Sequence, residues 1–199
     1  LFYVFPSLFV CLLIKGLNRT SLNHEDPLPP LYTIYGGDDL CHGKINDKCI
    51  RGDKTKNPRI LIVGDSHTAH YTYFIDELGK KYGWSAKVLS SSSCSPVFNY
   101  NESLLPEWAH EGCKNLKDHF WSHYKEYDII VLSSRWDFHL GLSNCKGHDP
   151  DFFEKLDKTL FILSKDVKHI YVLSQIPLLF NHPFRLKKFM ALKFPMTLS

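Results

Sequence analysis

The sequence predicts an α/β fold, a three-layer sandwich in which helices cover both faces of a parallel sheet. From residue 59 onward, short apolar runs of strand length alternate with longer stretches of helical periodicity. The runs are almost continuously apolar, which is typical of strands buried on both faces. Of the 199 residues, 44% are hydrophobic and 14% are aromatic, so the chain can bury a sizeable core. This alternation implies right-handed crossovers between parallel strands.

Strands and helices are predicted in strict alternation along the domain. The strands cover 59–64, 86–91, 128–134 and 169–177, and the helices cover 67–83, 110–127 and 149–165. Gly83 ends the first helix, and Asp149 with Pro150 opens the last one.

The chain ahead of the first strand divides into two segments. Residues 1–17 are nearly all apolar, and we predict that they are the end of a transmembrane helix, with a buried core helix as the alternative. Residues 18–57 are rich in Pro, Gly and polar residues and are predicted to be a linker. The globular domain is then expected over residues 58–199.

Composition and spacing argue against nucleic-acid and metal binding. The formal net charge is +3, and no long basic run precedes the C-terminal FRLKKFMALK, so nucleic acid is a poor candidate partner. No C-x-x-C is present, and His119 and His123 have no cysteine pair to complete a zinc site. We therefore expect neither a metal nor a cofactor.

Four of the six cysteines flank polar loops in pairs. Cys41 and Cys49 enclose one loop, and Cys94 and Cys113 enclose another, so two loop-closing disulfides are the simplest pairing. Unpaired, half-buried thiols are the alternative. If the bridges form, the domain lies outside the reducing cytosol.

Polar residues follow three consecutive predicted strands, at the edge where open parallel sheets bind ligands. They are Gly64 to His67, Ser91 to Cys94, and Ser133 to Asp137. Ser66 has two interpretations, the N-cap of the following helix or a nucleophile. Ala69 stands where a capping box would place Glu or Gln. A serine at a helix N-terminus also lies beside N–H groups that can support an oxyanion.

Three motifs, in this order, resemble one branch of the GDSL/SGNH hydrolase superfamily. They are VGDSHTAH after the first strand, SCSP after the second, and IIVLSSRW at the third. The branch is the periplasmic SGNH domain attached to membrane-bound O-acyltransferases that acetylate bacterial surface polysaccharides. The resemblance covers residues 1 to about 180 and implies a flavodoxin-like sheet.

The resemblance implies a role for each motif. Ser66 matches the nucleophile, and its own N–H would be one oxyanion donor. The loop with Ser92 and Ser93 stands where the superfamily has a glycine that supplies a second donor, and a backbone N–H does not require glycine. Arg135 and Trp136 stand where the superfamily offers an asparagine, and a guanidinium can donate as an amide does. A surface ion pair for Arg135 and core packing for Trp136 are the alternatives.

The catalytic Asp and His of the superfamily, three residues apart near the C-terminus, have no clear counterpart. The D-x-x-H downstream of Ser66, Asp166 to His169, falls at the start of a strand and so at the opposite sheet edge. An earlier one, Asp39 to His42, falls in the predicted linker. His139 is the other possible base, and His67 is at most a residue that lines the site. We therefore expect a C-terminally incomplete domain that lacks this acid and base.

The resemblance implies an O-acetyltransferase that passes an acetyl group through Ser66 to a sugar hydroxyl of a surface polysaccharide or lipopolysaccharide, and that is inactive as this fragment. A membrane acyltransferase domain would deliver the donor, and the N-terminal helix would anchor the domain on the periplasmic side of the inner membrane. A carbohydrate esterase and a non-catalytic carbohydrate-binding remnant are the alternatives.

Overall fold

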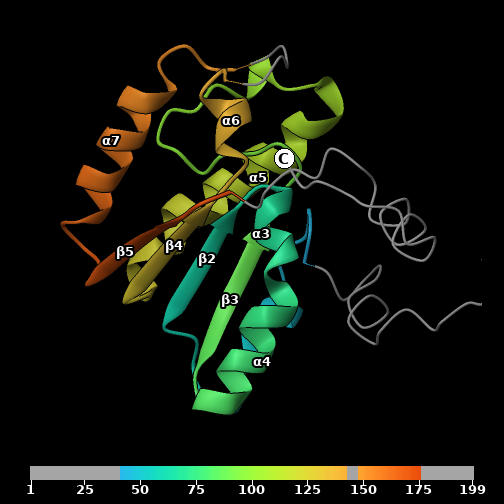
Figure 1. Ribbon diagram of the computed structural model, residues 1–199, viewed down its shortest axis with the longest axis vertical. Helices are drawn as coiled ribbons and strands as arrows, with labels where there is room; N and C mark the ends of the chain where they lie inside the picture. The colour runs from blue at the N-terminus through green and yellow to red at the C-terminus, as the bar shows by residue number, and fades with distance from the viewer. Residues whose placement is uncertain (1–40, 143–147, 176–199) are drawn as a thin grey trace, which may run out of the picture. The chain divides into compact units, whose positions relative to one another are not determined.

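The computed structural model describes residues 41–142 and 148–175, and these form a five-stranded sheet flanked by helices (Figure 1). The strands are β1 (Ile50–Gly52), β2 (Ile60–Gly64), β3 (Ser85–Ser90), β4 (Ile129–Ser133) and β5 (His169–Leu173). The helices are α3 (Ser66–His70), α4 (Thr72–Tyr82), α5 (Glu107–His123), α6 (Trp136–His139) and α7 (Phe152–Leu163), with 3-10 turns η2 (Asp47–Cys49), η3 (Glu102–Leu104) and η4 (Tyr124–Glu126).

The predicted transmembrane segment, residues 1–17, lies outside the described residues. Within the described part of the chain, no helix is long and apolar enough to cross a membrane.

The sheet order is β1-β3-β2-β4-β5, and the last four strands in this order run parallel. The register places Gly64 opposite both Ser90 and Ser133. The carboxyl ends of three neighbouring strands are therefore level. Residues that follow these strands, although far apart in sequence, begin from the same edge of the sheet.

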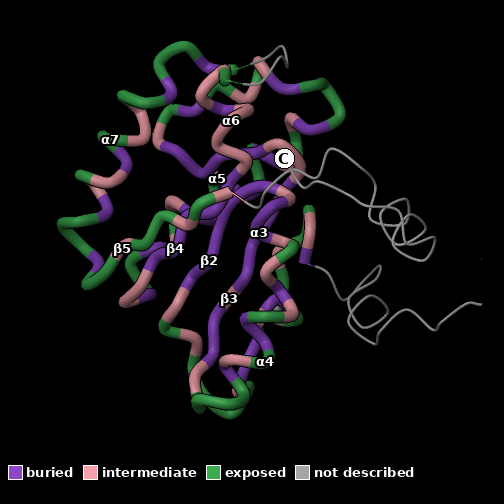
Figure 2. The backbone as a smooth tube through the Cα atoms, viewed as in Figure 1, coloured by how far each residue is buried: buried purple, intermediate pink, exposed green. Residues whose placement is uncertain are grey.

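Alternate residues of the central strands enter two cores, one on each face of the sheet. On β2, Leu61 and Val63 join the larger cluster with residues of α5 and α7, whereas Ile62 joins the smaller cluster with Ile75 of α4. The central strands are buried along most of their length (Figure 2). Helices α4 and α5 accordingly lie on opposite faces (Figure 1), which confirms the predicted three-layer α/β arrangement.

Strand β1 changes two expectations. It pairs antiparallel with β3, so the sheet is mixed rather than wholly parallel. It also lies in the segment 18–57, so the linker interpretation does not hold for the part of that segment that forms η2 and β1. Three residues are too few to show a period in the sequence. A Cβ at Gly52, where φ is 90°, would overlap Trp84 O, so this close approach depends on glycine.

The predicted helix 67–83 is two helices. Tyr71 separates α3 from α4, and its N–H bonds back to Thr68 O in a tight turn. The helical periodicity continues through this point, and so the sequence did not indicate the break. Gly83 ends α4 in the left-handed conformation, as its position predicted.

Candidate active site

Ser66 occupies the first position of α3, directly beyond the carboxyl end of β2. Its neighbour caps the helix, because the Asp65 side chain accepts a hydrogen bond from His67 N at 2.8 Å. The capping interpretation of Ser66 therefore does not hold. Its half-buried hydroxyl makes no hydrogen bond to another described residue. It is available to a ligand.

Two buried side chains in this turn tie α3 to the end of β4. Asp65 Oδ2 accepts from Arg135 N at 2.6 Å. Thr68 Oγ1 donates to Ser133 O at 2.7 Å. A Cβ at Gly64 would overlap Ser133 O, so the turn can approach β4 this closely only with glycine there. The candidate nucleophile is thus fixed against the sheet without using its own hydroxyl.

The β3 loop, residues 91–94, lies beside this turn. Ser91 N donates to Gly64 O at 3.1 Å, which joins the loop to the end of β2. Ser93 has φ of 55°, in the left-handed region where residues other than glycine are uncommon. Cys94 forms the predicted disulfide with Cys113 of α5. The loop therefore keeps a backbone shape that glycine would adopt freely, although the sequence places a serine there.

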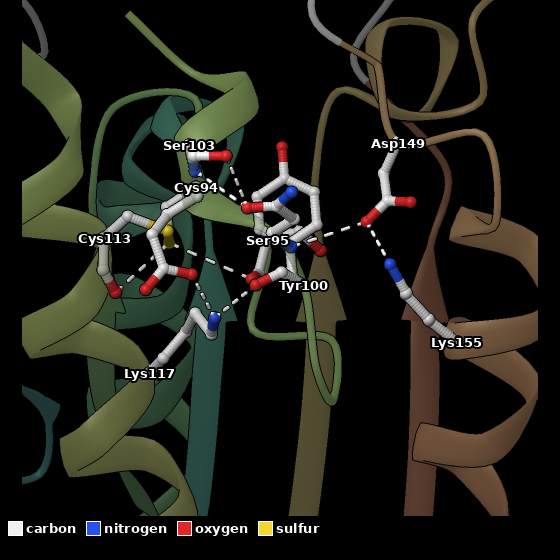
Figure 3. Close-up of polar contacts among 10 residues, drawn as sticks. Cys94, Ser95, Tyr100, Ser103, Cys113, Lys117, Asp149 and Lys155 are labelled. Carbon is white, nitrogen blue, oxygen red and sulfur yellow. Dashed lines mark hydrogen bonds and ion pairs between the residues drawn. A yellow bond between two sulfur atoms is a disulfide. The ribbon is translucent and has the colours of Figure 1, made fainter. Parts of the chain in front are cut away.

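Lysines on two helices hold the segment that continues from this loop (Figure 3). Lys117 of α5 donates to Tyr100 O at 2.5 Å. Lys155 of α7 pairs with Asp149 at 2.6 Å, and that carboxylate also accepts from a backbone N–H of the segment at 3.4 Å. The chain after the disulfide is therefore tied to both α5 and α7.

Arg135 and Trp136 follow β4, at the same edge as the candidate nucleophile. The Arg135 guanidinium donates to Asp137 from Nε at 3.1 Å, which is the ion pair that the sequence left open as an alternative. Trp136 Nε1 donates to Leu173 O at 2.6 Å, and its ring lies 6.3 Å from that of Phe152. Trp136 therefore packs against the core. A contact of either side chain with an oxyanion stays a prediction.

His139 is completely buried behind the Gly-Asp-Ser turn. Its ring stacks on Phe152 with centroids 5.1 Å apart, and the edge of Tyr100 meets it at 5.5 Å. Its Nε2 lies 3.4 Å from Asp65 Oδ2, and neither ring nitrogen has a full hydrogen bond among the described residues. This enclosed position suits orientation of Asp65 better than proton transfer with a substrate.

His169, the other possible base, lies at the wrong edge of the sheet. It is exposed, and the register places it opposite Ile129 at the amino end of β4. Asp166 of the same D-x-x-H accepts from Tyr124 Oη at 2.7 Å. The motif therefore lies at the amino edge of the sheet, away from Ser66, as its position in the sequence indicated. Asp166 there connects the start of β5 to η4.

His42 is the residue at this edge that sequence reasoning missed. It forms a β-bridge with Ser90, and its Nδ1 lies 3.0 Å from Ser90 Oγ. Its Nε2 lies 2.8 Å from Ser92 Oγ. The sequence offered two signals, the D-x-x-H from Asp39 to His42, which was assigned to the linker, and adjacency to Cys41. The predicted disulfide from Cys41 to Cys49 is present and closes this segment against β1.

Two histidines at this edge have lowered pKa values. Burial lowers the pKa of His42 and of His67 below the usual 6.5, against the opposing effect of the Asp65 charge. His70, whose ring lies 5.7 Å from that of His67, lowers both further. Both imidazoles are therefore neutral at pH 7. Within the described ranges, no group of three or more His, Cys, Asp or Glu could hold a metal.

A pocket of about 430 Å³ lies at the amino edge of the sheet, away from Ser66. Arg59, Trp84 and Asp128 are among its lining residues. Arg59 and Asp128 pair with each other there. This pocket contains no nucleophile beside a helix N-terminus, so the chemistry assigns the candidate site to the opposite, carboxyl edge.

Three features define an SGNH-type α/β domain. They are the three-layer fold, the unbonded serine on the first turn after β2, and the polar loops after β3 and β4. Residues 35–198 match the family described as SGNH domain (fused to AT3 domains). The chain belongs to this family, which confirms the resemblance inferred from its motifs.

One solved structure is similar in fold, the periplasmic domain of a lipopolysaccharide acetyltransferase from Salmonella ser. Paratyphi A. The TM-score is 0.51 and the sequence identity 14%, over 86% of this chain and 69% of that one. No curated protein sequence matches the chain.

Proposed function

We propose that this domain carries an acetyl group on Ser66 and transfers it to a sugar hydroxyl of a surface polysaccharide. Membership of the SGNH family fused to AT3 acyltransferase domains supports an O-acetyltransferase role. The similar periplasmic domain comes from a lipopolysaccharide acetyltransferase. The observation that carries the proposal is the hydroxyl of Ser66, which is positioned at the start of α3 while Asp65 caps the helix.

The proposed acetyl transfer proceeds in two steps. Ser66 Oγ attacks the acetyl carbonyl of a donor ester, its proton passes to a base, and the donor alcohol leaves after taking up a proton. A sugar hydroxyl then attacks the acetyl-serine, gives up its proton, and frees the Ser66 hydroxyl. The Ser66 N–H and an N–H of the β3 loop would receive the negative charge that develops on the carbonyl oxygen in each step.

Family membership supports a donor in the membrane and a polysaccharide acceptor. An AT3 domain in the membrane would deliver the acetyl group, and the acceptor would be a polysaccharide or lipopolysaccharide on the periplasmic side. Both disulfides support a location outside the reducing cytosol. Among the described residues, no histidine hydrogen-bonds to the Ser66 hydroxyl. We therefore expect slow acetylation of Ser66 by the 199-residue chain and little turnover.

Mass spectrometry after incubation with p-nitrophenyl acetate tests the first step. The expected result is a single acetyl group on the peptide that contains Ser66, formed slowly and lost slowly, because an oxyanion hole without a base retains roughly 10³ to 10⁴-fold acceleration over water. Ser66→Ala should remove this adduct. Ser164→Ala, an exposed serine beyond α7, is the matched control and should keep it. Acetylation that spreads over surface residues and is unaffected by Ser66→Ala would contradict the proposal.

A further inference from the structure

We infer that His42 is a positioning residue that holds Ser92 and thereby fixes the N–H groups of the β3 loop for the oxyanion. The inference rests on the proposed function, because it assigns a further residue to the same site. Its evidence is the pair of contacts from one imidazole to two serine hydroxyls, 3.0 Å to Ser90 Oγ and 2.8 Å to Ser92 Oγ.

The segment that carries His42 is anchored on both sides. On one side, Gly43 N donates to Ser90 O at 2.7 Å, which joins the segment to the end of β3. On the other, the disulfide from Cys41 to Cys49 closes the loop that leads into β1, and β1 itself pairs with β3. The imidazole therefore projects from a fixed part of the domain.

The β3 loop requires such support because of its backbone shape. Ser93 adopts the left-handed conformation, which is unfavourable for a residue with a Cβ unless its surroundings impose it. The bond from Ser91 N to Gly64 O holds the loop before Ser93, and the disulfide at Cys94 holds it afterwards. The contact from His42 to Ser92 supplies the anchor between them.

An imidazole suits this role. A neutral imidazole has one N–H donor and one acceptor nitrogen, and a serine hydroxyl can donate or accept. Both contacts of His42 are therefore satisfied in either tautomer. A glutamine side chain keeps a donor and an acceptor at similar reach but cannot act as a base, so it separates positioning from proton transfer.

The test compares His42→Ala, His42→Gln and Ser92→Ala in the full chain, with His70→Ala as control. His70 is an exposed histidine at the same edge that bonds to neither serine. One readout is the rate at which p-nitrophenyl acetate acetylates Ser66, followed by mass spectrometry. The other is the set of backbone amide NMR shifts of the β3 loop, which requires no reaction.

We expect His42→Ala and Ser92→Ala each to shift the loop amides and to slow acetylation on the order of ten- to a hundredfold. This is less than the roughly 10² to 10³-fold cost of losing an oxyanion donor outright, because the N–H groups are displaced and not removed. The double variant should be no slower than either single variant, because both remove the same contact. His42→Gln should stay within a few-fold of the parent rate, and His70→Ala should match it.

Two outcomes would overturn the inference. If His42→Gln is as slow as His42→Ala while the loop amides keep their parent shifts, the imidazole acts as a base and not by positioning. If His42→Ala and Ser92→Ala both leave the amide shifts of the β3 loop unchanged, His42 does not position that loop. Failure of the parent chain to acetylate Ser66 would instead contradict the proposed function, and the amide shifts would still decide the role of His42.

Discussion

At the scale of single residues, one carboxylate organises the candidate site. Asp65 caps α3 through His67 N, accepts Arg135 N from the loop after β4, and lies 3.4 Å from the buried His139. The motif alone indicated a turn with several reactive side chains. It did not indicate that Asp65 would cap the helix and leave the Ser66 hydroxyl without a partner among the described residues. Asp is as good an N-cap as Ser. Ala69 in the capping-box position argued against Ser66 as the cap, but no residue in the sequence indicated that Asp65 takes this role.

Asp65→Asn should lower the free energy of unfolding by about 1 to 3 kcal/mol. The asparagine oxygen can still cap α3, but its N–H₂ group then faces the Arg135 N–H and leaves that buried donor without an acceptor. Urea unfolding measures the change. Asp157→Asn, on the exposed side of α7, makes the same chemical change away from the site and should cost far less. Equal effects of the two substitutions would contradict the role of Asp65.

The lowered histidine pKa values predict a loss of stability in mild acid. His42, His67 and His119 have folded-state pKa values below 6.5, chiefly because burial disfavours their charged forms. The unfolded chain therefore binds protons first as the pH falls. The stability that these neutral histidines contribute to the folded state is fully present above pH 6.5. It is lost as the pH falls from 6.5 through their lower folded-state pKa values.

Urea unfolding between pH 7.5 and 5 measures this dependence. The free energy of unfolding should decrease toward pH 5, and His67→Gln should make the decrease shallower. Ser164→Ala replaces an exposed residue that does not titrate and should leave the slope unchanged. A slope that is the same in all three proteins would show that His67 does not contribute.

At the scale of elements, apolar composition predicted the fold. Contacts between residues distant in sequence determined the features that it did not predict, such as strand β1 and the position of His42. The runs that became β2 and β4 are evident because both faces of each strand are buried. Strand β1 is too short to leave a pattern, and its pairing with β3 is set by residues more than thirty positions away. The position of His42 depends likewise on serines 48 and 50 residues later.

The disulfide between Cys94 and Cys113 should stabilise the domain by about 2 to 4 kcal/mol, since it closes a loop with a sequence separation of 19. Replacing both cysteines with alanine should lower the free energy of unfolding by that amount and slow acetylation of Ser66, because the β3 loop loses one anchor. The control is addition of reductant, which should destabilise the parent and have a smaller effect on the variant. Free thiols at both positions in non-reduced protein from the periplasm would contradict the pairing.

At the scale of the whole molecule, the level ends of β2, β3 and β4 bring the three motifs to one edge. Gly64 pairs with Ser90 and Ser133, so the Gly-Asp-Ser turn lies between the β3 loop and the loop after β4. The order of the motifs along the chain could therefore predict the site once a parallel sheet was assumed. It could not predict whether Arg135 faces a substrate, because its ion pair with Asp137 depends on side-chain geometry.

A single-turnover chase tests whether Ser66 passes an acetyl group to a sugar. The 199-residue chain is first acetylated with ¹³C-labelled p-nitrophenyl acetate, and then surface polysaccharide or buffer alone is added. Label should leave Ser66 faster with polysaccharide than with buffer and should appear as an O-acetyl ester on the sugar. Ser66→Ala should give no transfer. Release of label as acetate at the same rate with and without polysaccharide would contradict transfer to a sugar and would indicate an esterase instead.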